Sequence, residues 1–215
     1  MSAFPVIAID GPAASGKGTI ARRVAAALGF AHLDTGTLYR VVGLAVLRKG
    51  GDPGDAALAT AAVSSLDLSL LEDPALRAHA TSVAASKVAT IVAVRDALLA
   101  FQRNFAAHPP GGHGAVLDGR DIGTVICPDA TVKLFVTASP EVRARRRFLE
   151  LTKNGTHITE AEVLADIQSR DARDSGRAVA PLKQAADAHL LDTSHLDIEA
   201  ATARALDIVR AALRT

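Results

Sequence analysis

Glycines, a lysine and a threonine recur over residues 11–19 at a spacing that can bind phosphate. The segment reads Gly-Pro-Ala-Ala-Ser-Gly-Lys-Gly-Thr, with Lys17 and Thr19 near its end. Glycine lets several backbone N–H groups face one concavity, a following helix adds its positive end, and Lys17 adds a charge that can reach outer phosphates. The strict pattern has a hydroxyl directly after the lysine, whereas Gly18 intervenes here. A chance turn between a strand and a helix is the alternative.

The neighbouring elements are those that such a loop requires. The apolar run over 6–9 predicts a buried parallel strand before it, and residues 17–28, ended by Gly29, predict a helix after it. Further strands are expected at 31–33, 115–117, 132–136 and 188–191. Further helices are expected at 37–48, 140–151, 159–172 and 197–213. The alternation predicts an α/β fold, a five-stranded parallel sheet with helices on both faces, whose ligands lie beyond the carboxyl ends of the strands.

The middle of the chain carries weaker signals. Residues 55–63 predict a weak helix, and the apolar–polar alternation over 66–71 predicts a short half-exposed strand. A long helical stretch is expected from Pro74 to Phe105, with a break near 91–94 where β-branched residues cluster. Turns are expected at 109–112 and at Asn154–Gly155.

Three aspartates, Asp34, Asp118 and Asp192, each follow a predicted strand and so fall at the edge of the phosphate-binding segment. Asp118 can order a magnesium shell, Arg120 can bind a phosphate through two hydrogen bonds, and Asp121 can accept one from an exocyclic amine. The alternative is a loop with an internal Arg–Asp pair. Residues 34–40 can hold a second phosphorylated group, or can be a helix cap with a solvated arginine.

Two basic clusters follow. Arg143, Arg145, Arg146 and Arg147, with Lys153, can stabilise the negative charge of a transferring phosphoryl group; the alternative is a solvated helix face. In the second cluster, 170–177, the aspartate Asp174 can take ribose hydroxyls while arginines meet phosphates. Ion pairs within one helix are the alternative there.

Composition narrows the class of protein. The chain has 215 residues, with 24 basic against 23 acidic, so we expect one domain and no binding to nucleic acid or membrane surfaces. Cys127 is the only cysteine, which excludes an intramolecular disulfide and fits a reducing compartment. The N-terminal apolar run is too short for a signal peptide or a membrane span, so we expect a cytoplasmic protein. The seven histidines show no metal-binding spacing.

Four stretches, 9–19, 33–40, 118–124 and 169–182, make the chain resemble the bacterial cytidylate kinases, in the order and at roughly the spacing of that family. The Gly-Lys-Gly-Thr variant is similar to that of other nucleoside monophosphate kinases. The resemblance implies a P-loop kinase fold and transfer of the γ-phosphoryl group of ATP to CMP or dCMP, with Mg²⁺, in pyrimidine metabolism. It also implies small nucleotides as the partners, and we expect a monomer.

The resemblance also assigns roles to residues. The ATP phosphates would be held by Gly11, Pro12, Ala13, Ala14, Ser15, Gly16, Lys17, Gly18 and Thr19. The CMP site would contain Thr35, Tyr39, Arg40, Ser86, Arg95, Arg120, Asp121, Arg170, Asp174 and Arg177. The catalytic set would be Lys17, Arg120, Arg146, Arg147, Arg173 and Arg177, and Thr19 and Asp118 would hold magnesium through water.

The resemblance further implies one kinase domain over 1–215, with a core of 1–36, 113–142 and 170–215. A nucleoside-monophosphate insert would occupy about 37–112, and a mobile arginine-rich lid about 143–169. The family usually carries a small antiparallel sheet in this insert, before the helix of Ser86. Only about ten residues, 66–75, stand in that place, so the insert is short.

We expect direct in-line transfer without a covalent enzyme intermediate. Three other functions stay open from the residues. The chain can be another P-loop kinase for a small metabolite, a UMP-preferring kinase, or a non-enzymatic nucleotide switch. A switch needs no second phosphate site, and no Asn-Lys-x-Asp element for reading guanine is present.

Overall fold

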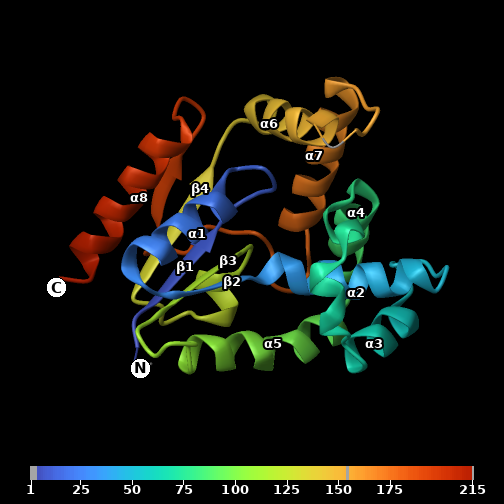
Figure 1. Ribbon diagram of the computed structural model, residues 1–215, viewed down its shortest axis with the longest axis horizontal. Helices are drawn as coiled ribbons and strands as arrows, with labels where there is room; N and C mark the ends of the chain where they lie inside the picture. The colour runs from blue at the N-terminus through green and yellow to red at the C-terminus, as the bar shows by residue number, and fades with distance from the viewer. Residues whose placement is uncertain (1–3, 154, 215) are drawn as a thin grey trace. The chain divides into compact units, whose positions relative to one another are not determined.

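The computed structural model describes residues 4–153 and 155–214 (Figure 1). By its contacts the chain divides into two compact units. The sheet unit comprises the described residues of Met1–Leu33 and Phe105–Thr215, and the helical unit comprises Asp34–Asn104.

The sheet unit is built on a five-stranded sheet, which confirms the predicted parallel sheet. The strands are β1 (Val6–Asp10), β2 (Ala31–Asp34, whose last residue belongs to the helical unit), β3 (Ala115–Gly119), β4 (Val132–Thr137) and β5 (His189–Asp192). Their order in the sheet is β2-β3-β1-β4-β5. Central β1 runs parallel to both neighbours, with Ile9 opposite Asp118 of β3 and Leu134 of β4. All five β1 residues are buried, as expected of a central strand in a sheet covered by helices. The carboxyl ends of β1, β3 and β4 therefore meet at one edge of the sheet.

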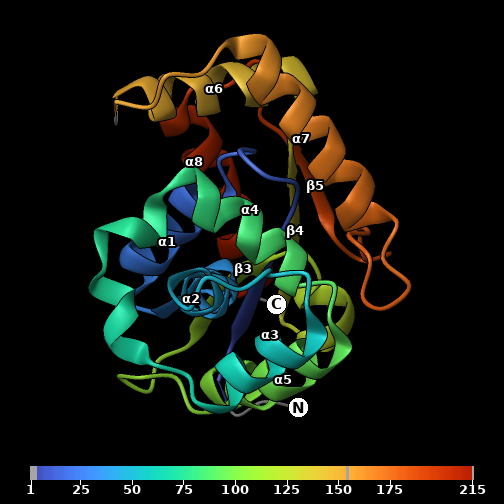
Figure 2. The same ribbon diagram turned by 90° about the vertical axis from the view of Figure 1, so that its right-hand side faces the viewer.

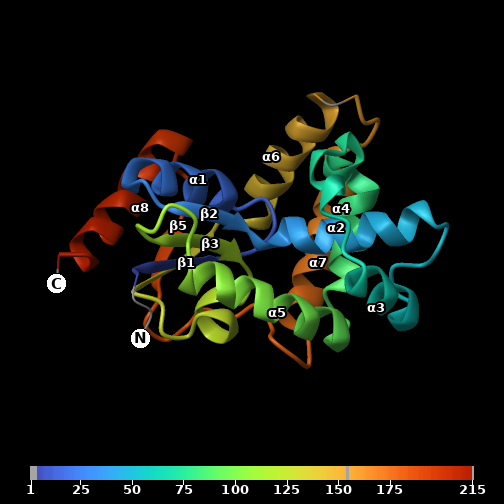
Figure 3. The same ribbon diagram turned by 60° about the horizontal axis from the view of Figure 1, so that its bottom comes forward.

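Helices α1 (Lys17–Leu28) and α8 (Ile198–Ala212) pack together on this sheet, as Figures 1 and 3 show. Fully buried Val24 of α1 and Val209 of α8 join Ile7 and Ile9 of β1 in one apolar core. Small side chains such as Ala21 and Ala205 let the helices approach the strands closely. The predicted ends of α1 are confirmed, since Gly29 caps it in a left-handed conformation with φ 66°.

Two further helices, α6 (Pro140–Lys153) and α7 (Glu160–Ser175), pack against each other (Figure 2). Both helices begin with a side-chain cap: Ser139 Oγ accepts a hydrogen bond from Val142 N at 3.3 Å, and Thr159 and Glu162 form a reciprocal capping box. Asn154 lies outside the described residues, and with it the predicted turn at Asn154–Gly155. A short irregular helical turn, η3 (Ile122–Ile126), follows β3.

The helical unit contains α2 (Thr35–Arg48), α3 (Ala56–Ser64), η1 (Leu68–Glu72), η2 (Pro74–Arg77), α4 (His79–Val88) and the start of α5 (Val92–Ala107), several of which Figure 3 labels. Asp34 caps α2 by accepting a hydrogen bond from Thr37 N at 3.3 Å. The helix predicted at 37–48 is confirmed, and its apolar face, with Leu38, Val42 and Val46, is buried against α3, α4 and α5. The break in the long helical stretch falls at 89–91, just before the predicted place.

The predicted strand over 66–71 is wrong. This segment contains η1, a short 3₁₀ helix that Asp67 caps by accepting hydrogen bonds from Ser69 N and Ser69 Oγ at 3.0 and 2.6 Å. The structure describes all of residues 35–104 and places no strand there, so a strand at 66–71 would have had no partner to pair with. Alternating polarity also fits a tight turn that buries Leu70 and leaves Leu71 exposed.

Candidate functional site

The phosphate loop (residues 11–19) connects β1 to α1, and its backbone requires glycine at two positions. Gly11 has φ 155°, and a Cβ there would lie 2.0 Å from the carbonyl oxygen of Val136. Gly16 has φ 90° and caps α1 without a side-chain hydrogen bond. The loop thus passes close to β4 and leaves the N–H groups at the start of α1 without a side-chain cap, which suits an anion.

Three side chains of the loop are arranged around this helix end. Lys17 Nζ donates a hydrogen bond to the carbonyl oxygen of Pro12 at 3.3 Å, so the ammonium group folds back over the loop. Thr19 Oγ1 accepts one from Arg22 at 3.3 Å. Ser15 Oγ is buried and has no hydrogen-bond partner among the described residues. Ala14 adopts a left-handed conformation with φ 59°, which costs an L-residue roughly 1 kcal/mol.

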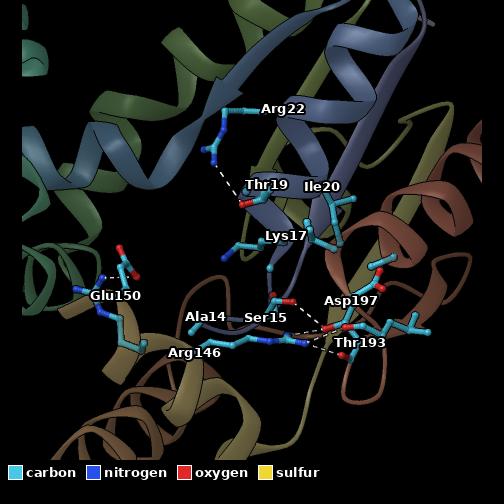
Figure 4. Close-up of a pocket in the computed structure, with 16 residues that line it drawn as sticks. Ala14, Ser15, Lys17, Thr19, Ile20, Arg22, Arg146, Glu150, Thr193 and Asp197 are labelled. Atoms are coloured by element: carbon cyan, nitrogen blue, oxygen red, sulfur yellow. Dashed lines mark hydrogen bonds and ion pairs between the residues drawn. The ribbon is translucent and has the colours of Figure 1, made fainter. Parts of the chain in front are cut away.

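A cavity of about 470 Å³ opens beside the loop, and Figure 4 shows its lining. One wall is the loop and the first turn of α1, a second comes from α6, and a third from the connection between β5 and α8. All these segments belong to the sheet unit. The lining residues are Ala14–Ile20, Arg22, Arg146, Arg147, Glu150, Thr193, Leu196, Asp197, Ile198 and Ala201. The cavity joins a cationic loop to a partly apolar far end, which suits a phosphorylated ligand with an organic body.

Arg146 and Thr193 connect two walls of this cavity (Figure 4). The guanidinium of Arg146 donates to Thr193 Oγ1 at 3.0 Å, to the Thr193 carbonyl at 2.7 Å and to the Leu196 carbonyl at 3.4 Å. Thr193 Oγ1 in turn donates to the carbonyl oxygen of Ser15 at 3.0 Å. These contacts hold the Arg146 guanidinium beside the loop, with Thr193 joining it to the Ser15 carbonyl.

The other arginines of the first basic cluster differ in environment. Arg147 pairs with Glu150 at 2.8 Å and lines the cavity, and its Nη2 is buried with no partner among the described residues. Arg145 is exposed and pairs with Glu160. Arg143 is 3 % exposed, away from solvent and outside the cavity lining, so neither sequence interpretation of this residue holds. The carboxylate of Asp171 on α7 forms an ion pair with the Arg143 guanidinium.

The second basic cluster surrounds Asp174, which is fully buried. Its carboxylate lies 2.9 Å from Arg120 Nε and 3.8 Å from Arg170 Nε, and it also accepts a short hydrogen bond from Arg177. Burial alone would raise the pKa of Asp174, but the positive charges of Arg120, Arg177 and Arg170 outweigh it and lower that pKa. The structure therefore brings four predicted CMP-site residues together with an excess of positive charge. Asp174 therefore has an ion pair within its own helix, with Arg170, and a second partner from a distant segment, Arg120.

Two more predicted residues of the sheet unit lie close to these groups in the chain. Asp121 is 4 % exposed and directly follows Arg120. Arg173, partly exposed on α7, donates to Ser169 Oγ at 3.4 Å. Asp121 thus has the buried environment expected of a base-reading carboxylate, whereas Arg173 is half-buried and hydrogen-bonded within its own helix.

Asp118 lies beside the phosphate loop. A Cβ placed on Gly18 would stand 3.7 Å from Asp118 Oδ1, and Asp118 Oδ2 lies 2.8 Å from His32 Nε2. Thr19 and Asp118 offer the oxygen donors that Mg²⁺ prefers. No cluster of three metal-binding side chains occurs within 4–153 and 155–214, and such a cluster is not required, because Mg²⁺ usually keeps waters and phosphate oxygens as ligands.

The predicted residues of the helical unit lie on three helices, and Ser86 and Arg95, expected in one long helical stretch, are on two different helices. Thr35, Tyr39 and Arg40 are on α2, Ser86 is on α4 and Arg95 is on α5. The guanidinium of Arg95 lies 5.9 Å from the centre of the Tyr39 ring, and Arg40 donates to the carbonyl of Leu76 at 3.2 Å. Thr35, Ser86 and Arg95 are all buried.

Sequence reasoning missed two residues that the structure brings to this region. Thr193 carries no motif, although its place directly after a strand was a usable signal. Asp10, the last residue of β1, is buried and accepts two backbone hydrogen bonds from the segment after Asp121. Nothing in its sequence context distinguishes it from a turn-forming aspartate.

No helix in the described part of the chain is long and apolar enough to cross a membrane. Among solved structures, the chain is similar to an uncharacterized protein from Eubacterium ventriosum, with a TM-score of 0.56 and 12% identity over 96% of this chain and 98% of the other. It is also similar to a gluconokinase from Sinorhizobium meliloti, with a TM-score of 0.54 and 13% identity over 100% and 97%. At such identities these likenesses concern the fold alone.

Comparison of sequences finds relatives with much higher identity to this chain. The chain is 59% identical to the cytidylate kinase of Bradyrhizobium sp. strain ORS 278 over 206 residues, 96% of each chain. It is 60% identical to that of Rhodospirillum rubrum, covering 95% of this chain and 96% of the relative. The family profile described as cytidylate kinase matches residues 7–211. Since this match includes the phosphate loop, both basic clusters and residues of all five strands, the chain belongs to the cytidylate kinase family.

Proposed function

We propose that this chain transfers the γ-phosphoryl group of ATP to CMP or dCMP, giving CDP or dCDP. The observation that carries the proposal is the 470 Å³ cavity on the phosphate loop, in a chain about 60% identical to curated cytidylate kinases over nearly its full length. In this proposal the cavity binds the nucleotide donor, ATP. The relatives supply the identity of the acceptor.

The cavity is the ATP site in this proposal. The loop N–H groups and the N-terminal end of α1 bind the β- and γ-phosphates, and Lys17 turns from the Pro12 carbonyl to the transferring group. The segment 193–198 contacts the adenosine part at the far end. The residues that hold the donor phosphates are Gly11, Pro12, Ala13, Ala14, Ser15, Gly16, Lys17, Gly18 and Thr19.

Each of the two units carries side chains assigned to the acceptor in this proposal. In the sheet unit, Arg120 and Arg177 hold the CMP phosphate, Arg170 and Asp174 hold the ribose hydroxyls, and Asp121 accepts a hydrogen bond from the cytosine amine. The charge excess around buried Asp174 supports an anionic ligand there. In the helical unit the acceptor set is Thr35, Tyr39, Arg40, Ser86 and Arg95.

Transfer is direct and in line. An oxygen of the CMP phosphate forms a bond to the γ-phosphorus while the bond from that phosphorus to the β-γ bridging oxygen breaks, and ADP leaves. Lys17, Arg146, Arg147 and Arg173 stabilise the charge that spreads over the γ-oxygens, with Arg120 and Arg177 on the acceptor side. Protein groups supply position and charge, and no covalent enzyme intermediate forms.

Mg²⁺ fits beside Thr19 and Asp118, whose oxygens would hold it through water. When bound, it neutralises charge on the β- and γ-phosphate oxygens. The chain's own contribution is to keep the Asp118 carboxylate beside Gly18, where His32 orients it through a 2.8 Å contact.

In this proposal the nucleoside-monophosphate insert is about 37–112, the lid is about 143–169, and the rest is the core of a single kinase domain. The lid closes only when both nucleotides are bound, because an exposed γ-phosphate would be lost to water. We also propose that the enzyme acts as a monomer in the cytoplasm, and the lone Cys127 fits such a reducing compartment.

A coupled assay of ADP formation with ATP and each common nucleoside monophosphate tests the function. CMP and dCMP should exceed the other acceptors at least about 10-fold in kcat/KM, because buried polar groups go unpaired with the wrong base. A preference for UMP or for a small metabolite would replace the acceptor assignment. ATP turnover that is independent of any acceptor would indicate a nucleotide switch.

A further inference from the structure

Asp10 links two segments of the site that are far apart in sequence. It is the last residue of β1 and directly precedes Gly11 of the phosphate loop. Its Oδ1 accepts a hydrogen bond from Ile122 N and its Oδ2 accepts one from Gly123 N, both at 2.8 Å. These two N–H groups come directly after Arg120 and Asp121.

Two adjacent N–H groups on two oxygens of one carboxylate fix a segment in position and in orientation. The contact is also closely packed, because a Cβ on Gly123 would stand 3.4 Å from Asp10 Oδ2 and 3.1 Å from Lys133 Cδ. An asparagine at position 10 offers only one oxygen, and its amide nitrogen would face an N–H donor. The arrangement therefore depends on a carboxylate.

The carboxylate is held there at an energetic cost. Asp10 is 5 % exposed, and burial raises its pKa to about 6 against the two backbone hydrogen bonds and Lys17, which lower it. The negative charge of Asp121 raises the same pKa further. A neutral side chain would avoid this desolvation but would leave one of the two buried N–H groups without an acceptor.

We propose that Asp10 is a positioning residue that sets Arg120 and Asp121 in register with the phosphate loop. The role rests on the proposed function, in which Arg120 binds the CMP phosphate and Asp121 the base. Asp10 touches neither nucleotide. It acts through the backbone of Ile122 and Gly123, so its effect falls on the acceptor. The donor loop keeps its position through the pairing of β1 with β3 and β4.

The test is steady-state kinetics of Asp10→Asn with CMP and ATP varied separately. The KM for CMP should rise at least 10-fold, while the KM for ATP stays within about threefold of wild type. Asp187→Asn is the matched control. It removes the exposed carboxylate that pairs with buried Lys133, and because the amide oxygen of asparagine can still accept a hydrogen bond from that lysine, both KM values should stay unchanged. A uniform loss of folded protein would lower kcat without separating the two KM values.

Gly123→Ala provides a second variant that keeps the Asp10 charge. Its methyl group presses on Asp10 Oδ2 and the Lys133 stem, so the KM for CMP should rise in the same selective way by about threefold or more. Melting temperatures of both variants identify any that fails to fold. An Asp10→Asn enzyme that folds with an unchanged KM for CMP, or with equal rises for both substrates, overturns the proposal. If Asp10→Asn does not fold, the proposal is overturned by a Gly123→Ala enzyme whose KM for CMP is unchanged or whose two KM values rise equally. A wild-type enzyme that fails to phosphorylate CMP instead overturns the proposed function.

Discussion

Arg143 of α6 donates two parallel hydrogen bonds to the carboxylate of Asp171 on α7, at 3.0 and 2.5 Å. The same guanidinium donates to the carbonyl of Ala138, where β4 leads into α6, and to the carbonyl of Ala13 in the phosphate loop. One buried side chain therefore ties α6, α7 and the loop together. This contact network makes Arg143 a structural residue, whereas its neighbour Arg146 faces the cavity.

Replacing Arg143 by alanine should destabilise the protein strongly. The change leaves the Asp171 carboxylate and two carbonyl oxygens without their donor, and breaking a buried pair costs on the order of 3 kcal/mol. Urea unfolding at pH 7 measures the loss. Arg145→Ala, from the exposed pair with Glu160 on the same two helices, is the control and should cost under about 1 kcal/mol. Equal effects of the two substitutions would contradict the structural role of Arg143.

Lys17→Ala should lower kcat at least about 100-fold, the scale for removing one preorganised charge from a transition state. The fold should persist, because the Lys17 ammonium makes a 3.3 Å contact with the Pro12 carbonyl at the surface of the loop rather than in the core. The assay is CMP-dependent ADP formation, paired with a thermal melt. Lys183→Ala removes an exposed lysine and should keep full activity. A near-normal rate for Lys17→Ala would argue against the phosphate loop as the donor site.

Arg146→Ala should raise the KM for ATP about 10-fold or more, the effect of losing a hydrogen bond to a charged group. The KM for CMP should change far less. Thr193→Val keeps Arg146 but removes the hydroxyl that joins it to the Ser15 carbonyl, and should shift the same constant in the same direction by less. Initial rates with ATP varied at saturating CMP, and with CMP varied at saturating ATP, give the two constants. A change confined to the KM for CMP would refute the donor assignment.

Asp10 should make stability depend on pH. Its pKa is about 6 in the folded protein against an ordinary 3.8, with burial as the main cause, so the folded state holds an extra proton between these values. The contribution is complete below about pH 4 and is lost as pH rises through 6, by roughly 3 kcal/mol in total. Asp10→Asn lacks this proton. Urea unfolding of both proteins at pH 4.5, 5.5, 6.5 and 7.5 should show the wild type losing stability relative to the variant as pH rises. Parallel curves would show that Asp10 does not titrate in this range.

Local patterns account for what could be predicted from the sequence. The strand, the glycine turn and α1 lie within 25 residues of each other, and the caps at Gly29 and Thr159 are set by neighbouring residues. The segment 66–71 shows the limit of such reasoning. Its alternating polarity fits a strand, but a strand forms only where another strand can pair with it, and residues 35–104 contain none.

The sequence by itself determined the family, the parallel sheet and the phosphate loop, because each depends on residue types at short, regular spacing. Only the tertiary structure decided which arginines face the cavity and which are buried in pairs. Arg143 and Asp171 are 28 residues apart, Arg146 and Thr193 are 47 apart, and Asp10 and Ile122 are 112 apart. Contacts over such separations form only when packing brings the elements together, and no local pattern encodes them.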